Sequence, residues 1–143
     1  MSFRSPDAAA IESLLRQARI VAVLGLSNNP ARPSFGVARS LQHFGYRVIP
    51  VNPAEQEILG EPCQPTLDSA VSSLRPSERI DIVDVFRRPE HVAGIVDDCI
   101  RLRLPALWLQ DGVIDAAAAA RAQAAGIVTV MDRCIYRDRA RLS

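Results

Sequence analysis

Residues 20 to 52 constrain the fold of this chain more than any other segment. An apolar run at 20–24 leads into Gly25, and a stretch of helical spacing ends at Gly45 before a second apolar run reaches Val51. Strand, glycine-bearing turn, helix and strand in this order form the first half of a nucleotide-binding α/β unit. Because the first strand is apolar throughout, it predicts a parallel sheet that is covered on both faces.

Two departures from the dinucleotide-binding pattern narrow the range of possible ligands. The turn after the first strand lacks G-x-G-x-x-G, and the second strand ends at Asn52. An acidic residue at that position would be needed to hold the ribose 2′-hydroxyl of NAD. The segment therefore predicts a ligand that carries a pyrophosphate and is not NAD.

Length and hydropathy indicate a single globular domain. The chain of 143 residues fits one domain, 1–143, with the core expected at about residues 20 to 134. No apolar run approaches the roughly 20 residues that span a bilayer, and the N-terminus lacks the basic start and apolar centre of a signal peptide. We expect a cytoplasmic protein without a membrane partner.

The charged residues exclude several function classes. A formal net charge of +1 gives no electrostatic case for a nucleic-acid partner. All 17 cationic residues are Arg, which genomic base composition explains. Without Lys the chain has neither a Schiff-base amine nor a P-loop lysine, so Arg must supply any side-chain cation for a phosphate. Three scattered cysteines and two histidines indicate no disulfide framework and no zinc site.

Apolar periodicity predicts alternating strands and helices. We expect strands at about residues 20–25, 46–51, 80–86, 105–109 and 127–131. We expect helices at about residues 7–18, 35–44, 67–74, 89–102 and 115–125. The proline-rich residues 53–67 predict a turn and a short extended piece, with the place of a further strand left open, and the arginine-rich tail after Cys134 predicts a surface extension. The alternation predicts an α/β, three-layer Rossmann-like fold with a mainly parallel, five- to six-stranded sheet and helices on both faces.

Single residues mark the expected helix ends. Asp7 lies near the start of the first helix, Ser34 predicts the N-cap of the second, and Asp115 predicts the N-cap of the last. Gly45 and Gly126 each follow a helical stretch, where a left-handed residue ends the helix.

The carboxyl ends of the strands are the expected binding region, because ligands of open parallel sheets bind where the strand order reverses. The candidate ends are residues 25–34, 51–53, 85–88, 110–112 and 132–134. In the first of these, the start of the following helix offers unpaired amides, Ser27 a hydroxyl, Arg32 a cation and Gly25 close backbone approach. The alternative is a loop whose Ser and Asn residues only cap turns.

Residues 86–89, Phe-Arg-Arg-Pro, form the second notable strand end. An aromatic ring beside arginines can stack on an adenine and pair with phosphate, although a core Phe with two solvated arginines is the alternative. Trp108, within an apolar strand, predicts a core residue. Cys134 can face the cleft, but no histidine is placed by the sequence to activate it, which favours a structural thiol.

Several motifs together resemble one known family. They are V-L-G-L-S at 23–27, R-P-S at 32–34, V-N-P at 51–53, D-I-V-D-V-F-R-R-P-E at 81–90, W-L-Q-D-G-V at 108–113 and M-D-R-C at 131–134. The chain resembles the small bacterial CoA-binding proteins, stand-alone domains similar to the CoA-binding Rossmann domain of the succinyl-CoA synthetase α subunit. The resemblance covers nearly all of residues 20–134.

The resemblance implies coenzyme A in a Rossmann-like cleft. It implies that residues 25–27 meet the phosphates, that Asn52 borders the adenosine half, and that residues 85–87 flank the adenine or pantetheine. A neutral Asn52 does not repel the 3′-phosphate of CoA, for which Arg32 or Arg87 would supply the compensating charge. The candidate cofactor-binding residues are Gly25, Leu26, Ser27, Asn28, Arg32, Pro33, Ser34, Asn52, Pro53, Val85, Phe86 and Arg87.

The resemblance does not extend to catalysis. The ligases use a phosphorylated histidine from a domain that this chain lacks, so no catalytic residue and no metal ligand is predicted. The favoured hypothesis is a non-catalytic protein that binds CoA or acyl-CoA. The alternatives are an enzyme subunit of CoA-thioester or NAD(P)-linked chemistry and an interaction domain with a vestigial cleft. The sequence does not decide whether the chain has a protein partner.

Overall fold

The computed structural model describes residues 2–143 as one alternating series of strands and helices. In chain order the elements are α1 (Ala8–Gln17), β1 (Ile20–Leu24), α2 (Pro33–His43), β2 (Arg47–Val51), β3 (Glu57–Ile58), β4 (Glu61–Pro62), α3 (Leu67–Ser72), β5 (Ile82–Val85), a 3₁₀ turn (Pro89–His91), α4 (Val92–Arg101), β6 (Ala106–Leu109), α5 (Ala116–Ala124), β7 (Val128–Val130) and α6 (Ile135–Ala140).

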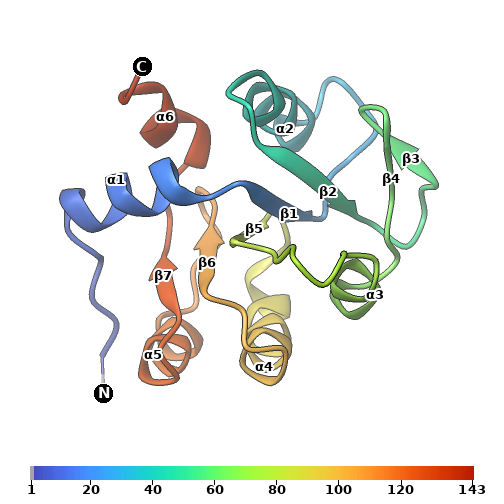
Figure 1. The fold of residues 1–143 in the computed structure, drawn as a ribbon. Helices are drawn as coiled ribbons and strands as arrows, with labels where there is room; N and C mark the ends of the chain where they lie inside the picture. Colours follow the sequence, from blue (N-terminus) through green and yellow to red (C-terminus); the bar gives the residue numbers. More distant parts are fainter. Residues whose placement is uncertain (1) are drawn as a thin grey trace.

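The five main strands form one parallel sheet in the order β2-β1-β5-β6-β7. Figure 1 shows α1, α2 and α6 over one face of this sheet and α3, α4 and α5 over the other. Apolar strand residues alternate between two buried clusters, one under each helical layer, as the pleat of a strand requires. The predicted α/β, three-layer Rossmann-like fold is therefore confirmed, with five strands in the main sheet.

The predicted helix ends are largely confirmed. The Asp7 carboxylate accepts a hydrogen bond from the Ala10 N–H, and the Asp115 carboxylate caps α5 in the same way. Gly45 has φ of 104°, a conformation that ends α2 at little steric cost only for glycine. The N-cap prediction for Ser34 is wrong, because Pro33 takes the first helical position and Arg32 the cap.

Two further segments differ from the sequence prediction. Residues after Cys134 are not a surface extension, since they form α6 and bury Ile135 completely. The extended piece within 53–67 does not join the main sheet as a full strand. It forms the antiparallel hairpin β3-β4, which Gln64 links to the end of β2 through a bridge with Val51. None of the helices in residues 2–143 has the length and apolar character needed to cross a membrane.

Candidate ligand-binding cleft

A cleft of about 1090 Å³ opens at the carboxyl ends of β1, β5, β6 and β7. β1 and β5 are neighbours in the sheet, but the chain leaves β1 toward α2 on one face and leaves β5 toward α4 on the other. Connections that diverge in this way leave an opening at the strand ends. The lining residues are Gly25, Ser27, Arg32, Pro33, Ser34, Gly36, Val37, Arg39, Ser40, Phe86, Arg87, Arg88, Pro89, Gln110, Asp111, Gly112, Val113, Cys134, Tyr136 and Arg137.

Gly25 lets the loop after β1 cross directly over the end of β5. Its φ is 80°, and a Cβ at this position would lie 2.2 Å from the Phe86 carbonyl oxygen and 2.8 Å from Cδ of Arg87. Only glycine fits both the backbone conformation and the space. The loop after β1 is thus packed against the residues that follow β5.

The rest of the first loop is held by its own hydrogen bonds. The Ser27 N–H donates to Oγ of Ser34 over 3.0 Å, and the Asn29 N–H donates to Oγ of Ser27 over 3.0 Å. In the first turn of α2, Pro33 has no N–H and the Phe35 N–H donates to the Arg32 carbonyl over 3.1 Å. The helix start therefore offers fewer unpaired donors than a usual N-terminus, and arginine side chains must supply most of the attraction for an anion.

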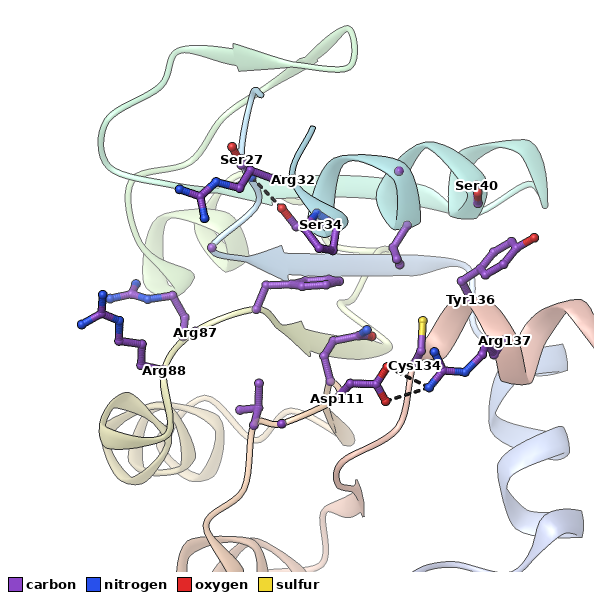
Figure 2. Close-up of a pocket in the computed structure, with 18 of the residues that line it drawn as sticks. Ser27, Arg32, Ser34, Ser40, Arg87, Arg88, Asp111, Cys134, Tyr136 and Arg137 are labelled. Carbon is purple, nitrogen blue, oxygen red and sulfur yellow. Dashed lines mark hydrogen bonds and ion pairs between the residues drawn. The ribbon is translucent and has the colours of Figure 1, made fainter. Parts of the chain in front are cut away.

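Three exposed arginines form the arginine end of the cleft: Arg32, Arg87 and Arg88. Figure 2 shows Arg32 above Arg87 and Arg88 on the same side of the opening. Within residues 2–143, none of the three has a carboxylate within the 4.0 Å of an ion pair. This contrasts with the arginines of α4, α5 and α6 that pair with aspartates.

The thiol end, which we define as Gln110, Asp111, Cys134, Tyr136 and Arg137, lies where β6 and β7 finish. Arg137 donates to both carboxylate oxygens of Asp111, over 2.8 and 2.7 Å, and this pairing raises the pKa of Arg137. Figure 2 shows the sulfur of Cys134 directed toward the opening between Tyr136 and this ion pair. The charges at this end are thus already neutralised within the protein.

Asp84 lies in β5 beside Val23 of β1 and Trp108 of β6, on the face covered by α1, α2 and α6. Its carboxylate is fully buried, and neither oxygen accepts or donates a hydrogen bond within the described residues. Desolvation raises its pKa well above the usual 3.8. Asp81, by contrast, is satisfied, since its carboxylate accepts hydrogen bonds from the backbone N–H groups of Arg19 and Ile20.

The structure brings some of the predicted binding residues together around the cleft. These are Gly25, Ser27, Arg32, Pro33, Ser34, Phe86 and Arg87. The others do not line it, and local packing explains why. Leu26 and Val85 point into the core and are completely buried. Asn52 donates to the Leu26 carbonyl over 3.0 Å, while Asn28 and Pro53 are exposed, and Asn28 donates to Glu55 over 3.4 Å.

Several lining residues were missed by sequence reasoning. Gly36, Val37 and Ser40 follow Pro33 at spacings of three, four and seven, so the helical period would have placed them on the same face of α2. Tyr136 and Arg137 were missed because their segment was interpreted as a surface extension. Trp108 is a core residue, as predicted, and its indole N–H donates to the Arg133 carbonyl over 2.9 Å.

Comparisons with known proteins match the sequence and the fold of this chain. The family described as "CoA binding domain" matches residues 19–139. Uncharacterized protein YneT of Bacillus subtilis is 37% identical over 133 residues, which are 92% of this chain and 93% of that protein. A solved structure titled "cell-free ID.343" from Thermus thermophilus has a TM-score of 0.86 at 36% identity and covers 96% of this chain and 100% of that one.

A larger enzyme contains a related segment. An acetate–CoA ligase [ADP-forming] of Archaeoglobus fulgidus is 30% identical over 83 residues, which are 58% of this chain but 11% of the ligase. The fold and the cleft define a doubly wound α/β protein with an opening at the carboxyl ends of its strands. This chain belongs to the CoA-binding domain family, as the resemblance in its motifs indicated.

Proposed function

We propose that this protein binds CoA or acyl-CoA in the cleft and carries out no catalysis of the ligase type. The observation that carries the proposal is the arginine end, where three cations without carboxylate partners stand at the strand ends of a CoA-binding domain. Unpaired arginines at a cleft suit an anionic ligand with several phosphate groups. CoA has a diphosphate and a 3′-phosphate.

The shape of the cleft supports a ligand with one charged and one neutral half. Arg32, Arg87 and Arg88 are positioned for the phosphates, and Gly25 leaves the backbone open to close approach. The neutral pantetheine arm then extends along α2 toward the thiol end. Its amide groups suit a wall that combines apolar and polar side chains such as Phe86 and Gln110.

The absence of ligase-type catalysis in this proposal rests on the composition of the cleft. Of the two histidines, His43 is at the end of α2 and His91 is in the 3₁₀ turn, and neither lines the cleft. The chain also corresponds to a small part of the related ligase. A histidine-dependent phosphoryl transfer would therefore need a second protein.

Isothermal titration calorimetry in reducing buffer tests the proposal. We expect micromolar affinity for CoA and little or none for NAD, with a loss of roughly tenfold for Arg32→Ala or Arg87→Ala, since each removes a charge-assisted hydrogen bond. Arg75→Ala is the matched control, because Arg75 is exposed in the segment that follows α3 and does not line the cleft. If CoA produces neither heat nor a shift in unfolding temperature, the proposal is wrong and an interaction domain becomes the better description.

A further inference from the structure

Cys134 differs from the other two cysteines in its access to the cleft. Its residue is only 7% exposed, yet it lines the cleft at the thiol end. Cys99 is in the core, where burial raises its pKa to about 12. Cys63 is partly buried away from the cleft, its thiol faces the Asn52 carbonyl, and burial raises its pKa as well. Only Cys134 among the three can meet a ligand that occupies the cleft.

Gln110 provides a second and independent indication of a ligand at this end. The residue is 4% exposed, and its Oε1 accepts a hydrogen bond of 3.1 Å from the Ile135 N–H, directly after Cys134. The other end of the carboxamide, Nε2, donates to no group within residues 2–143, and Gln110 is one of the residues that line the cleft. Two fixed N–H donors beside a thiol suit the carbonyl oxygens of a pantetheine arm.

Arg137 lies near Cys134 at the same end of the cleft (Figure 2). Arg137 is close enough for the negative charge of a Cys134 thiolate to contribute to the raised pKa of the guanidinium, although the ion pair with Asp111 is the larger cause. The thiolate is the form of a cysteine that attacks a disulfide. The thiol, the amide donor and the cation therefore meet at one end of one cleft, opposite the arginine end.

We propose that Cys134 captures the thiol half of the bound ligand by thiol–disulfide exchange, forming a mixed disulfide with CoA. The inference deepens the proposed function and rests on it. The Sγ thiolate of Cys134 attacks one sulfur of CoA disulfide, the original S–S bond breaks, and a new bond joins Cys134 to one CoA. The second CoA departs as a thiolate and takes up a proton, so Cys134 is oxidised and one CoA sulfur is reduced. No further oxidant is required.

Intact mass spectrometry of the reductant-free protein treated with CoA disulfide tests this step. We expect a mass increase of one CoA less the two thiol hydrogens, reversed by dithiothreitol and mapped by peptide analysis to Cys134. The anchored adenylate half raises the effective concentration of the disulfide, so labelling of Cys134 should be at least roughly tenfold faster than by glutathione disulfide. Adenosine 3′,5′-bisphosphate, which has phosphates but no thiol, should slow it by competition.

Matched variants separate this site from general thiol reactivity. Cys134→Ser should lose the adduct, whereas Cys63→Ser should keep it at the wild-type rate. An adduct on Cys63, or equal rates with the two disulfides, overturns the inference. The calorimetry above separates the two proposals. A protein that binds CoA in reducing buffer but forms no adduct at Cys134 overturns only the covalent step, whereas a protein that binds no CoA overturns the proposed function.

Discussion

The two ends of the cleft differ in how their charged side chains are satisfied. At the arginine end, Arg32, Arg87 and Arg88 are exposed and have no carboxylate partner within the described part of the chain. At the thiol end, Arg137 is paired with Asp111 through two hydrogen bonds. An unpaired cation is available to an anion, whereas a paired cation must first break its existing bonds. The difference indicates which half of the proposed ligand each end suits.

Replacing Gly25 should have the largest effect, because this residue joins the first loop to the end of β5. In Gly25→Ala the new Cβ must occupy space 2.2 Å from the Phe86 carbonyl oxygen at a φ of 80°. We expect a loss of stability on the order of 3 kcal/mol and the loss of CoA binding. Urea denaturation and calorimetry measure the two effects.

Gly94→Ala is the matched control for this change. Gly94 lies in α4, and a Cβ there meets nothing within 4 Å. Alanine should therefore stabilise the protein by roughly 0.5 to 1 kcal/mol. If Gly25→Ala behaves like Gly94→Ala, the close contact between the two strand ends is not required.

Asp84, buried in β5 two residues before Phe86, should give the next largest effect. Its pKa is raised by burial, so the neutral form is favoured in the folded protein. Its contribution to stability is fully present below the unfolded pKa of about 4 and is lost as the pH rises through the folded pKa. We expect Asp84→Asn to increase the free energy of unfolding at pH 7 by about 2 kcal/mol, because no charge is then available to bury.

The pH profile provides the control for Asp84. The difference between Asp84→Asn and wild type should grow from pH 4 upward, because other titrating groups contribute equally to both proteins. Denaturant unfolding at several pH values measures this difference. A difference that stays constant with pH would mean that the Asp84 carboxyl does not titrate differently in the folded state.

Arg87→Ala tests the arginine end directly. We expect affinity for adenosine 3′,5′-bisphosphate to fall by the same factor as affinity for CoA, roughly tenfold, because both ligands present phosphates to this end. Calorimetry with the two ligands measures both losses. If only CoA binding weakens, Arg87 contacts the pantetheine half and the assignment of the two ends is reversed.

Breaking the ion pair at the thiol end should have the smallest effect. The side chains of Arg137 and Asp111 are 57% and 49% exposed, so solvent screens their attraction. Arg137→Gln should change the free energy of unfolding by less than about 1 kcal/mol. It should leave binding of the bisphosphate unchanged in calorimetry. A loss of bisphosphate binding as large as that of Arg87→Ala would contradict the division of the cleft into two ends.

Much of the fold could be predicted because its signals are local. Asp7 and Asp115 cap helices through contacts three residues along the chain, and Gly45 ends α2 through its own backbone. Ser34 misled the N-cap prediction because Pro33 is even better suited to the first helical position. The segment after Cys134 was also predicted wrongly, as a surface extension. Its run of arginines suggests a solvated tail, while Ile135 is buried only because α6 packs beside α1 and α2.

The candidate site could be predicted only in part, because local signals do not show which side chains face the cleft. The strand ends around Gly25 and Phe86 follow from the order of strands and from the motifs that resemble CoA-binding proteins. Which residue at each end faces the opening depends on backbone direction and on contacts between distant segments. Asn52 illustrates this. Its side-chain amide donates to the Leu26 carbonyl, and the residue does not line the cleft.

The amino-acid sequence by itself determined the α/β class, the strand-end location of the cleft and the fact that any Lys or Arg side chain that holds a phosphate must be arginine. These properties depend on residue type and on periodicities of a few residues, so they are present before the chain is folded. Only the tertiary structure decided that Gly25 touches Phe86, that Asp84 is buried without a partner, and that Gln110 and Cys134 meet at one end. Each of these depends on how separate strands are brought side by side, which no local pattern encodes.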